Sequence, residues 1–206
     1  MQIDLQNIGK KFNTEWIFRQ VSFSFKENSA SAILGRNGSG KSTLLQIIAG
    51  NIYPSSGHVT YQHNGKVISG DEIFRHLTVV APYLELIEDF TLREMMEFHF
   101  SFKQFLPGFD ISGVIDLLGF PDTKYKQVHQ FSSGMKQRVK LILAFLSDVP
   151  LLLLDEPTMN LDKAGINWYH ELVTTFTRNR TLIICSNLHQ TESGFATASL
   201  QIEDYK

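Results

Sequence analysis

The sequence at residues 35–43 is Gly35-Arg36-Asn37-Gly38-Ser39-Gly40-Lys41-Ser42-Thr43. It satisfies the pattern G-x-x-x-x-G-K-[ST] of phosphate-binding loops at every required position. The glycines allow the backbone to curl so that several N–H groups point at one anion. Lys41 is then placed to reach the β- and γ-phosphates, and the Ser42 hydroxyl to bind Mg²⁺. The run therefore predicts a site for a nucleoside triphosphate with Mg²⁺.

The residues on either side of this loop supply the context that the pattern needs. An apolar strand is expected at residues 30–34, and a helix follows from Thr43 to Ala49 and ends at Gly50. A strand, a loop and a helix in this order place the phosphates over a helix N-terminus. The alternative is a glycine-rich turn that binds nothing, and the flanking elements favour nucleotide binding over it.

Composition and charge limit the other possibilities. The chain has 206 residues and a net charge of −2, which predicts one large domain and disfavours a nucleic-acid partner held by a basic surface. Cys185 is the single cysteine, so an internal disulfide is excluded, and a small buried side chain is expected there. No apolar run is long enough to span a membrane, and the first residues lack a signal pattern. The short stretch that ends at Lys206 predicts no regulatory domain.

The order of the expected elements predicts an α/β fold. Strands alternate with helices, which indicates a mainly parallel sheet, and the first strands indicate an antiparallel β patch. Expected strands are 2–8, 17–25, 30–34, 58–62, 77–81, 150–154, 181–186 and 195–202. Expected helices are 43–49, 91–105, 111–118, about 133–146 with Ser132 or Ser133 as its cap, and 163–178. We predict a single domain, 1–206, with an α/β core at 1–83 and 131–206 and a helical subdomain at about 84–130. Aromatic residues at helical spacing, Phe98, Phe102 and Phe105, are expected in the core of that subdomain.

Two carboxylates follow the most apolar strand. Leu151–Leu154 leads directly into Asp155 and Glu156. In an open α/β sheet, ligands bind at the carboxyl ends of the strands. Asp155 is therefore expected to hold Mg²⁺, and Glu156 to act on an attacking water as a general base or as a polarising group. An exposed acidic pair is the alternative, and the phosphate loop upstream makes it the weaker one.

A second segment of small residues opens a later helix. It comprises Ser132, Ser133, Gly134 and Met135, and it follows Phe131. N–H groups at the start of a helix attract a phosphate. Because the chain's own phosphate loop already covers one face of a nucleotide, we expect this helix to face the nucleotide of a partner subunit.

At these residues the chain resembles the ATP-binding cassette of ABC transporters, a P-loop NTPase, over essentially its whole length. Residues 35–43 match Walker A, 151–156 match Walker B, and 131–135 stand where the family has Leu-Ser-Gly-Gly-Gln. Asn160, Leu161 and Asp162 resemble the D-loop, and Phe12 resembles the aromatic residue that stacks on adenine, with Trp16 as the alternative. The resemblance implies two cassettes that close head-to-tail over two MgATP. It also implies an integral membrane subunit, a cytoplasmic location on the inner face of the membrane, and transport driven by closure and hydrolysis.

The chain departs from the family pattern at three places. The signature segment has Ser133 and Met135 in place of Gly and Gln, and Pro82 or Tyr83 occupies the position of a Gln that touches Mg²⁺. Asn187 stands at the switch His, where it is expected to contact the γ-phosphate, with His189 as the less favoured candidate. These changes predict slow but real ATP hydrolysis. An alternative function is a nucleotide-switched interaction module with little hydrolysis. A cassette that acts in translation or DNA repair is a third and less favoured function. The transported substrate would be selected by other chains.

Overall fold

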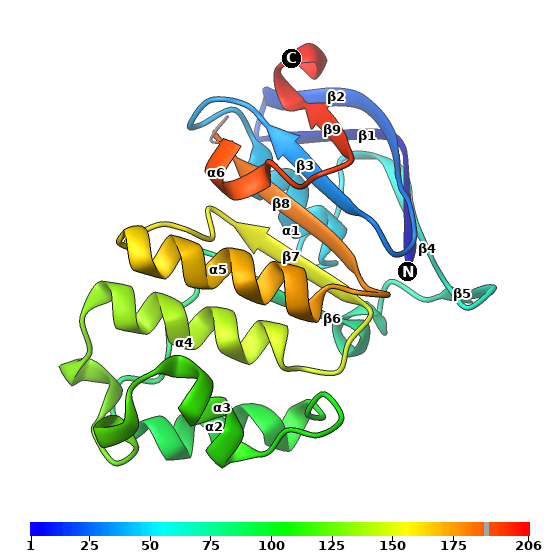
Figure 1. Ribbon diagram of the computed structural model, residues 1–206. Helices are drawn as coiled ribbons and strands as arrows, with labels where there is room; N and C mark the ends of the chain where they lie inside the picture. Colours follow the sequence, from blue (N-terminus) through cyan, green and yellow to red (C-terminus); the bar gives the residue numbers. More distant parts are fainter. Residues whose placement is uncertain (188–189) are drawn as a thin grey trace. The chain divides into compact units, whose positions relative to one another are not determined.

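A computed structural model describes residues 1–187 and 190–206 and forms two compact units (Figure 1). The first unit contains Met1–Val79, Val149–Glu156 and Arg178–Lys206. The second contains Val80–Asp148 and Pro157–Thr177. The boundaries expected at 84 and 130 stay a prediction, because the second unit holds that stretch together with the two helices that follow it.

An antiparallel sheet with the strand order β2-β1-β4-β5 forms one layer of the first unit. Its strands are β1 (Gln2–Phe12), β2 (Glu15–Phe25), β4 (Ser56–His63) and β5 (Lys66–Ile68). β1 and β2 form a hairpin in which Ile3 pairs with Phe25 and Phe12 pairs with Glu15. Along β2, Val21 and Phe25 are buried and the serines between them are exposed, as expected of a strand with one face toward the core.

The second sheet of this unit has the strand order β6-β7-β8-β3-β9. β3 pairs in parallel with β8 and β9, and β7 pairs in parallel with β8. Its strands are β3 (Ala30–Leu34), β6 (Leu77–Val80), β7 (Leu151–Asp155), β8 (Thr181–Ser186) and β9 (Ala198–Gln201). β7 and β8 are buried at every residue, as the apolar runs Leu151–Leu154 and Leu182–Cys185 within them predict.

The helix α1 (Lys41–Ile48) and the inner faces of both sheets share one hydrophobic core. Leu44 and Ile48 of α1 pack there with Phe18 of β2 and Leu153 of β7. Short elements complete this unit: η1 (Ile73–His76), α6 (Gln190–Ser193) and η4 (Ile202–Tyr205). The core therefore fixes the turn between β3 and α1, which carries the phosphate-loop sequence.

The second unit is helical, and Figure 1 shows α4 and α5 side by side with α3 and α2 beyond α4. Its elements are α2 (Leu92–Phe102), α3 (Ile111–Leu118), η2 (Pro121–Thr123), η3 (Val128–Gln130), α4 (Ser133–Phe145) and α5 (Lys163–Phe176). Thr91 and Glu94 form a reciprocal capping box at the start of α2. Ser132, rather than Ser133, caps α4 by accepting a hydrogen bond from the N–H of Met135 at 3.2 Å.

The expected aromatic core of this unit is partly wrong. Phe98 is 42% exposed and Phe102 is 75% exposed, and each packs edge-on against another aromatic ring. The apolar side of α2 that faces inward consists of Leu92, Met95 and Met96.

Among the residues that the structure describes, no helix combines the length and the hydropathy needed to cross a membrane.

Candidate nucleotide-binding site

The phosphate loop lies between the end of β3 and the start of α1. Gly40 precedes the helix with a φ of 103°, in the left-handed region that favours glycine. A Cβ atom at Gly40 would lie 2.7 Å from Cγ2 of Ile17 and 3.0 Å from Cδ1 of Phe18, so a side chain has no room there. No side chain caps the first turn of α1, which leaves its N-terminus to a ligand. The backbone thus has the form that an anion site requires.

The Lys41 side chain folds back over the loop. It is only 4% exposed, and its Nζ donates hydrogen bonds to the carbonyl oxygens of Gly35 at 2.9 Å and Arg36 at 3.0 Å. These two hydrogen bonds hold the ammonium group against the loop, and an ammonium group attracts phosphates as a compact point charge. The geometry fits the predicted contact with the outer phosphates.

Asp155 reaches the same place from the end of β7. It is 2% exposed, and the Ser42 side chain lies beside its carboxylate. Burial raises the pKa of the Asp155 carboxyl; the neighbouring Ser42 hydroxyl and the Lys41 charge lower this pKa, and the charge of Glu156 raises it. Oδ1 of Asp155 is buried without a hydrogen-bond partner among the described residues. A cation would satisfy this oxygen.

This donor set suits Mg²⁺. The ion takes hard oxygen ligands and is usually held by one or two carboxylates together with substrate phosphates and water. Asp155 and Ser42 offer such oxygens side by side, and no cluster of three His, Cys, Asp or Glu side chains occurs in the described part of the chain. The protein therefore supplies a partial set of ligands, which a nucleotide can complete.

Glu156 follows with an unusual backbone. Its φ is +46°, in the left-handed region that a residue with a side chain seldom adopts. Its N–H donates to the carbonyl oxygen of Cys185 at 3.0 Å, and the residue is partly exposed. Strained backbone of this kind persists where the surrounding structure holds it, and it often occurs at functional sites. The side chain predicted as the general base thus starts from a constrained backbone.

Asn187 lies immediately after β8 and reaches the phosphate loop. Its Nδ2 donates to Oδ1 of Asn37 at 3.5 Å, and its own Oδ1 is buried without a hydrogen-bond partner among the described residues. The structure therefore brings Asn187 to the loop, and its contact with a γ-phosphate stays a prediction. His189, the less favoured candidate, lies outside the described residues.

Two further groups stand near the phosphate loop. Cys185 is fully buried in β8, as predicted, and burial raises the pKa of its thiol well above the usual value, so the thiol stays neutral. Glu192 of α6 is 3% exposed, and its charge raises the pKa of Asp155. Sequence reasoning missed Glu192, because a single Glu beyond the last core strand carries no pattern.

The predicted adenine contact lies at the end of the β1–β2 hairpin. Phe12 is 51% exposed, and Nζ of Lys10 lies 5.1 Å from its ring centroid. The alternative, Trp16, is 37% exposed and lies under the charges of Lys11 and Arg19. Ile17 of β2 borders Gly40, so the hairpin runs beside the phosphate loop and carries an accessible aromatic ring.

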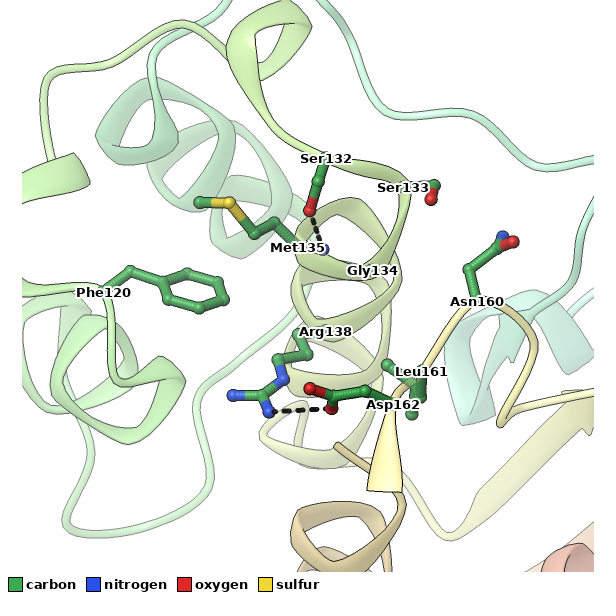
Figure 2. Close-up of a pocket in the computed structure, with 9 residues that line it drawn as sticks. All are labelled: Phe120, Ser132, Ser133, Gly134, Met135, Arg138, Asn160, Leu161 and Asp162. Atoms are coloured by element: carbon green, nitrogen blue, oxygen red, sulfur yellow. Dashed lines mark hydrogen bonds and ion pairs between the residues drawn. The ribbon is translucent and has the colours of Figure 1, made fainter. Parts of the chain in front are cut away.

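The signature segment and the D-loop lie together in the second unit (Figure 2). They line a cavity of about 410 Å³ with Phe120 and Arg138. Gly134 is required by close approach, because a Cβ there would lie 2.9 Å from the Asn160 carbonyl oxygen. Asp162 caps α5 by accepting a hydrogen bond from the N–H of Gly165 at 2.7 Å. Ser132 and Ser133 sit at the N-terminus of α4, as expected of a segment that meets a phosphate.

Arg138 of α4 is half-buried, and its charge has specific partners in the second unit. Its guanidinium lies 5.2 Å from the Trp168 ring centroid and 5.7 Å from that of Phe120, and 4.0 Å from Oδ1 of Asp162. Figure 2 shows its side chain directed toward Asp162. Sequence reasoning missed this role, because its aromatic partners are distant in the chain.

The position of the family's Gln is occupied differently. Pro82 and Tyr83 form a turn after β6, in which the N–H of Leu84 donates to the Ala81 carbonyl at 3.2 Å. Tyr83 is 46% exposed. The segment that follows is tied to α4 by the ion pair between Glu88 and Lys136. This ion pair joins the segment after the turn to the signature helix α4. Neither Pro82 nor Tyr83 supplies the side-chain amide that the family's Gln would offer to Mg²⁺.

Comparison with known proteins places these features in one family. Residues 18–159 match the family described as ABC transporter. The chain is 33% identical to the cytochrome c biogenesis ATP-binding export protein CcmA of Xylella fastidiosa (strain 9a5c), over 79% of this chain and 72% of that protein. It is 26% identical to the uncharacterized ABC transporter ATP-binding protein YybJ of Bacillus subtilis (strain 168), over 91% of this chain and 86% of that protein.

A solved structure has the same fold. The dimeric structure of MJ0796, a bacterial ABC transporter cassette, superposes with a TM-score of 0.81 at 24% identity, over 98% of this chain and 95% of that one. The order of the motifs, the sheet topology and the family match agree. The chain belongs to the ABC transporter family, as one of its ATP-binding cassettes.

Proposed function

We propose that this chain binds MgATP between its own phosphate loop and the signature segment of a second cassette, and that its hydrolysis of ATP powers a membrane transporter. Members of the family are ATPases. One observation carries the assignment of the site. Asp155 brings a buried, unpartnered carboxylate oxygen to Ser42 at the start of α1, where the phosphates of ATP would lie.

The residues of the first unit divide the chemistry among them. Lys41 would hold the β- and γ-phosphates by charge, while Mg²⁺ bound by Asp155 and Ser42 would neutralise them. Glu156 would take a proton from a water molecule while the oxygen of that water attacks the γ-phosphorus. The bond from the γ-phosphorus to the bridging oxygen would break, and ADP would leave with that oxygen. Asn187 would donate an amide hydrogen bond to the γ-phosphate; because an amide carries neither charge nor a transferable proton, it assists less than a His.

The signature segment suits the opposing nucleotide. Ser132 accepts the capping hydrogen bond with its oxygen, which leaves its hydroxyl proton to donate to a phosphate. The N-terminus of α4 adds a favourable electrostatic field. Ser133 and Met135 replace the family's Gly and Gln, while Ser132 and Gly134 of the family's segment are kept. These features support head-to-tail closure with a second copy or a related cassette.

Exposed apolar side chains support a membrane partner. In one stretch of the second unit, residues 83–102, they are Tyr83, Leu84, Ile87, Phe98 and Phe102. Exposed apolar groups close together on a surface are typical of protein interfaces. We infer that they meet an integral membrane subunit, which would hold the chain on the cytoplasmic face of the membrane.

We expect the chain to purify with its integral membrane subunit when the two are expressed together. Phe102→Asp should release the chain from the membrane fraction, because the charge would lie in an apolar interface. Tyr125→Asp, at a residue that is 74% exposed in the same unit, is the matched control and should stay bound. Equal retention of both variants in a detergent pull-down would contradict the placement of the interface.

Phe12→Ala should weaken ATP binding about tenfold, since aromatic stacking on a base contributes about 1–3 kcal/mol. Trp16→Ala should leave the affinity nearly unchanged, and fluorescence titration with an ATP analogue measures both. A larger loss for Trp16→Ala would transfer the adenine contact to Trp16.

A nucleotide-switched module with little hydrolysis is the less favoured function. Asn187 and the Pro82–Tyr83 turn are the observations that support it. The complete set of Lys41, Ser42, Asp155 and Glu156 favours hydrolysis. The alternative predicts no phosphate release above that of a variant without Glu156.

A further inference from the structure

Gln137 is a polar side chain on the buried side of the signature helix. It is 5% exposed and lies one turn from Leu141 in α4, where the other buried residues are apolar. A buried amide must be hydrogen-bonded or its burial is costly. An apolar residue would pack there with less penalty, so the amide calls for a specific explanation.

The partner of Gln137 provides it. Nε2 of Gln137 donates to the carbonyl oxygen of Pro157 at 2.8 Å. Pro157 is buried and is covalently joined to Glu156, the candidate general base. Because proline has no N–H, its carbonyl is the one backbone group through which this residue can be held by a hydrogen bond.

The backbone at Glu156 needs such restraint. Its φ of +46° is strained for a residue with a side chain, and it persists only where neighbouring contacts hold it. On one side the N–H of Glu156 is fixed by the Cys185 carbonyl at 3.0 Å. On the other side, the Gln137 amide holds the carbonyl oxygen of Pro157, the residue that directly follows Glu156. Hydrogen bonds therefore restrain the chain at Glu156 and at the residue after it.

The same helix holds the following residues at two more points. Gly134 lets the Asn160 carbonyl lie close to α4, and Arg138 approaches Asp162 (Figure 2). The first two turns of the signature helix therefore contact residues 157–162 at three points, and the contact made by Gln137 is the nearest to Glu156 in the chain. Pro157, whose carbonyl this hydrogen bond holds, is joined directly to Glu156.

We propose that Gln137 is a positioning residue for ATP hydrolysis, which aims Glu156 at the attacking water by holding the Pro157 carbonyl. The proposal rests on the role of Glu156 proposed above. It makes the signature helix, which meets the nucleotide of the second cassette, also a support for the catalytic carboxylate of its own chain. Binding of ATP does not use this hydrogen bond, so its loss should affect the chemical step alone.

Gln137→Met keeps the length of the side chain and removes the donor; Gln137→Glu keeps its shape and cannot donate when ionised. In steady-state ATP hydrolysis by the full chain, each should lower kcat about 10- to 100-fold, since a displacement of about 1 Å at a reacting group has an effect of that size. KM for ATP should stay within about twofold of the wild-type value. ATP-dependent dimer formation, measured in the Glu156→Gln background, should persist.

Gln104→Met makes the same chemical change at an exposed residue of the second unit and should leave kcat unchanged. An unchanged kcat in the Gln137 variants would overturn the proposal, and so would a loss of kcat that is accompanied by a raised KM and a lost dimer, which would indicate damage to packing. The role of Glu156 is tested separately by its own substitution. If Glu156→Gln abolishes turnover and Gln137→Met does not lower it, only the positioning role is lost.

Discussion

Glu156→Gln should abolish ATP turnover while leaving ATP bound. General-base catalysis contributes about 10²- to 10⁴-fold, and an amide cannot accept the proton from water. Gln has nearly the shape of Glu, so the strained backbone and the hydrogen bond to Cys185 can be kept. We expect phosphate release by the complex with its membrane subunit to fall at least about 100-fold. A stable ATP-held dimer should form in size-exclusion chromatography.

The control for this experiment is a carboxylate of the same chain outside the site. Glu171 is exposed on α5, and Glu171→Gln should turn over ATP at the wild-type rate. The wild-type chain should itself hydrolyse ATP slowly, because Asn187 and the Pro82–Tyr83 turn replace the family's His and Gln. Turnover by Glu156→Gln equal to that of the wild type would mean that another group serves as the base.

The parts of this site that are predictable from the sequence are local in the chain. β3, the phosphate loop and α1 follow one another without interruption, and each has its own pattern of apolar or glycine residues. β7 is likewise a pure leucine run with Asp155 at its end. Since the parallel pairing of β3, β8 and β7 brings their carboxyl ends to one edge, Asp155 and Asn187 arrive at the loop as predicted.

The parts that the sequence does not reveal depend on contacts between distant residues. Arg138 looks like an exposed helix residue until Phe120 and Trp168 are seen beside it. Phe98 and Phe102 have the spacing of a core and are nevertheless exposed, because helical spacing fixes a shared face but not what covers that face. Gln137 was detectable in principle, as a polar residue on an apolar stripe, but its partner Pro157 was not.

Lys41→Met should remove most of the affinity for ATP and ADP. Hydrogen bonds to a charged group contribute about 1.5–3 kcal/mol, so the loss of the ammonium should raise Kd about a hundredfold. Met matches the stem of the lysine, which is buried, and therefore preserves the packing. Isothermal titration calorimetry with ATP, ADP and AMP separates the affinity that comes from the β- and γ-phosphates from the affinity that comes from the rest of the nucleotide. AMP lacks the β- and γ-phosphates, so its affinity should change little.

The behaviour of AMP distinguishes lost phosphate binding from a damaged site. The Lys41 ammonium also holds the carbonyls of Gly35 and Arg36, so its removal leaves these two oxygens without their donor. If the loop collapsed as a result, AMP would be lost together with ATP. Lys66→Met removes the same charge at an exposed residue of β5 and should bind all three nucleotides normally. Wild-type affinity for ATP in Lys41→Met would contradict the phosphate contact, whereas a selective loss of ATP and ADP locates that contact at the outer phosphates.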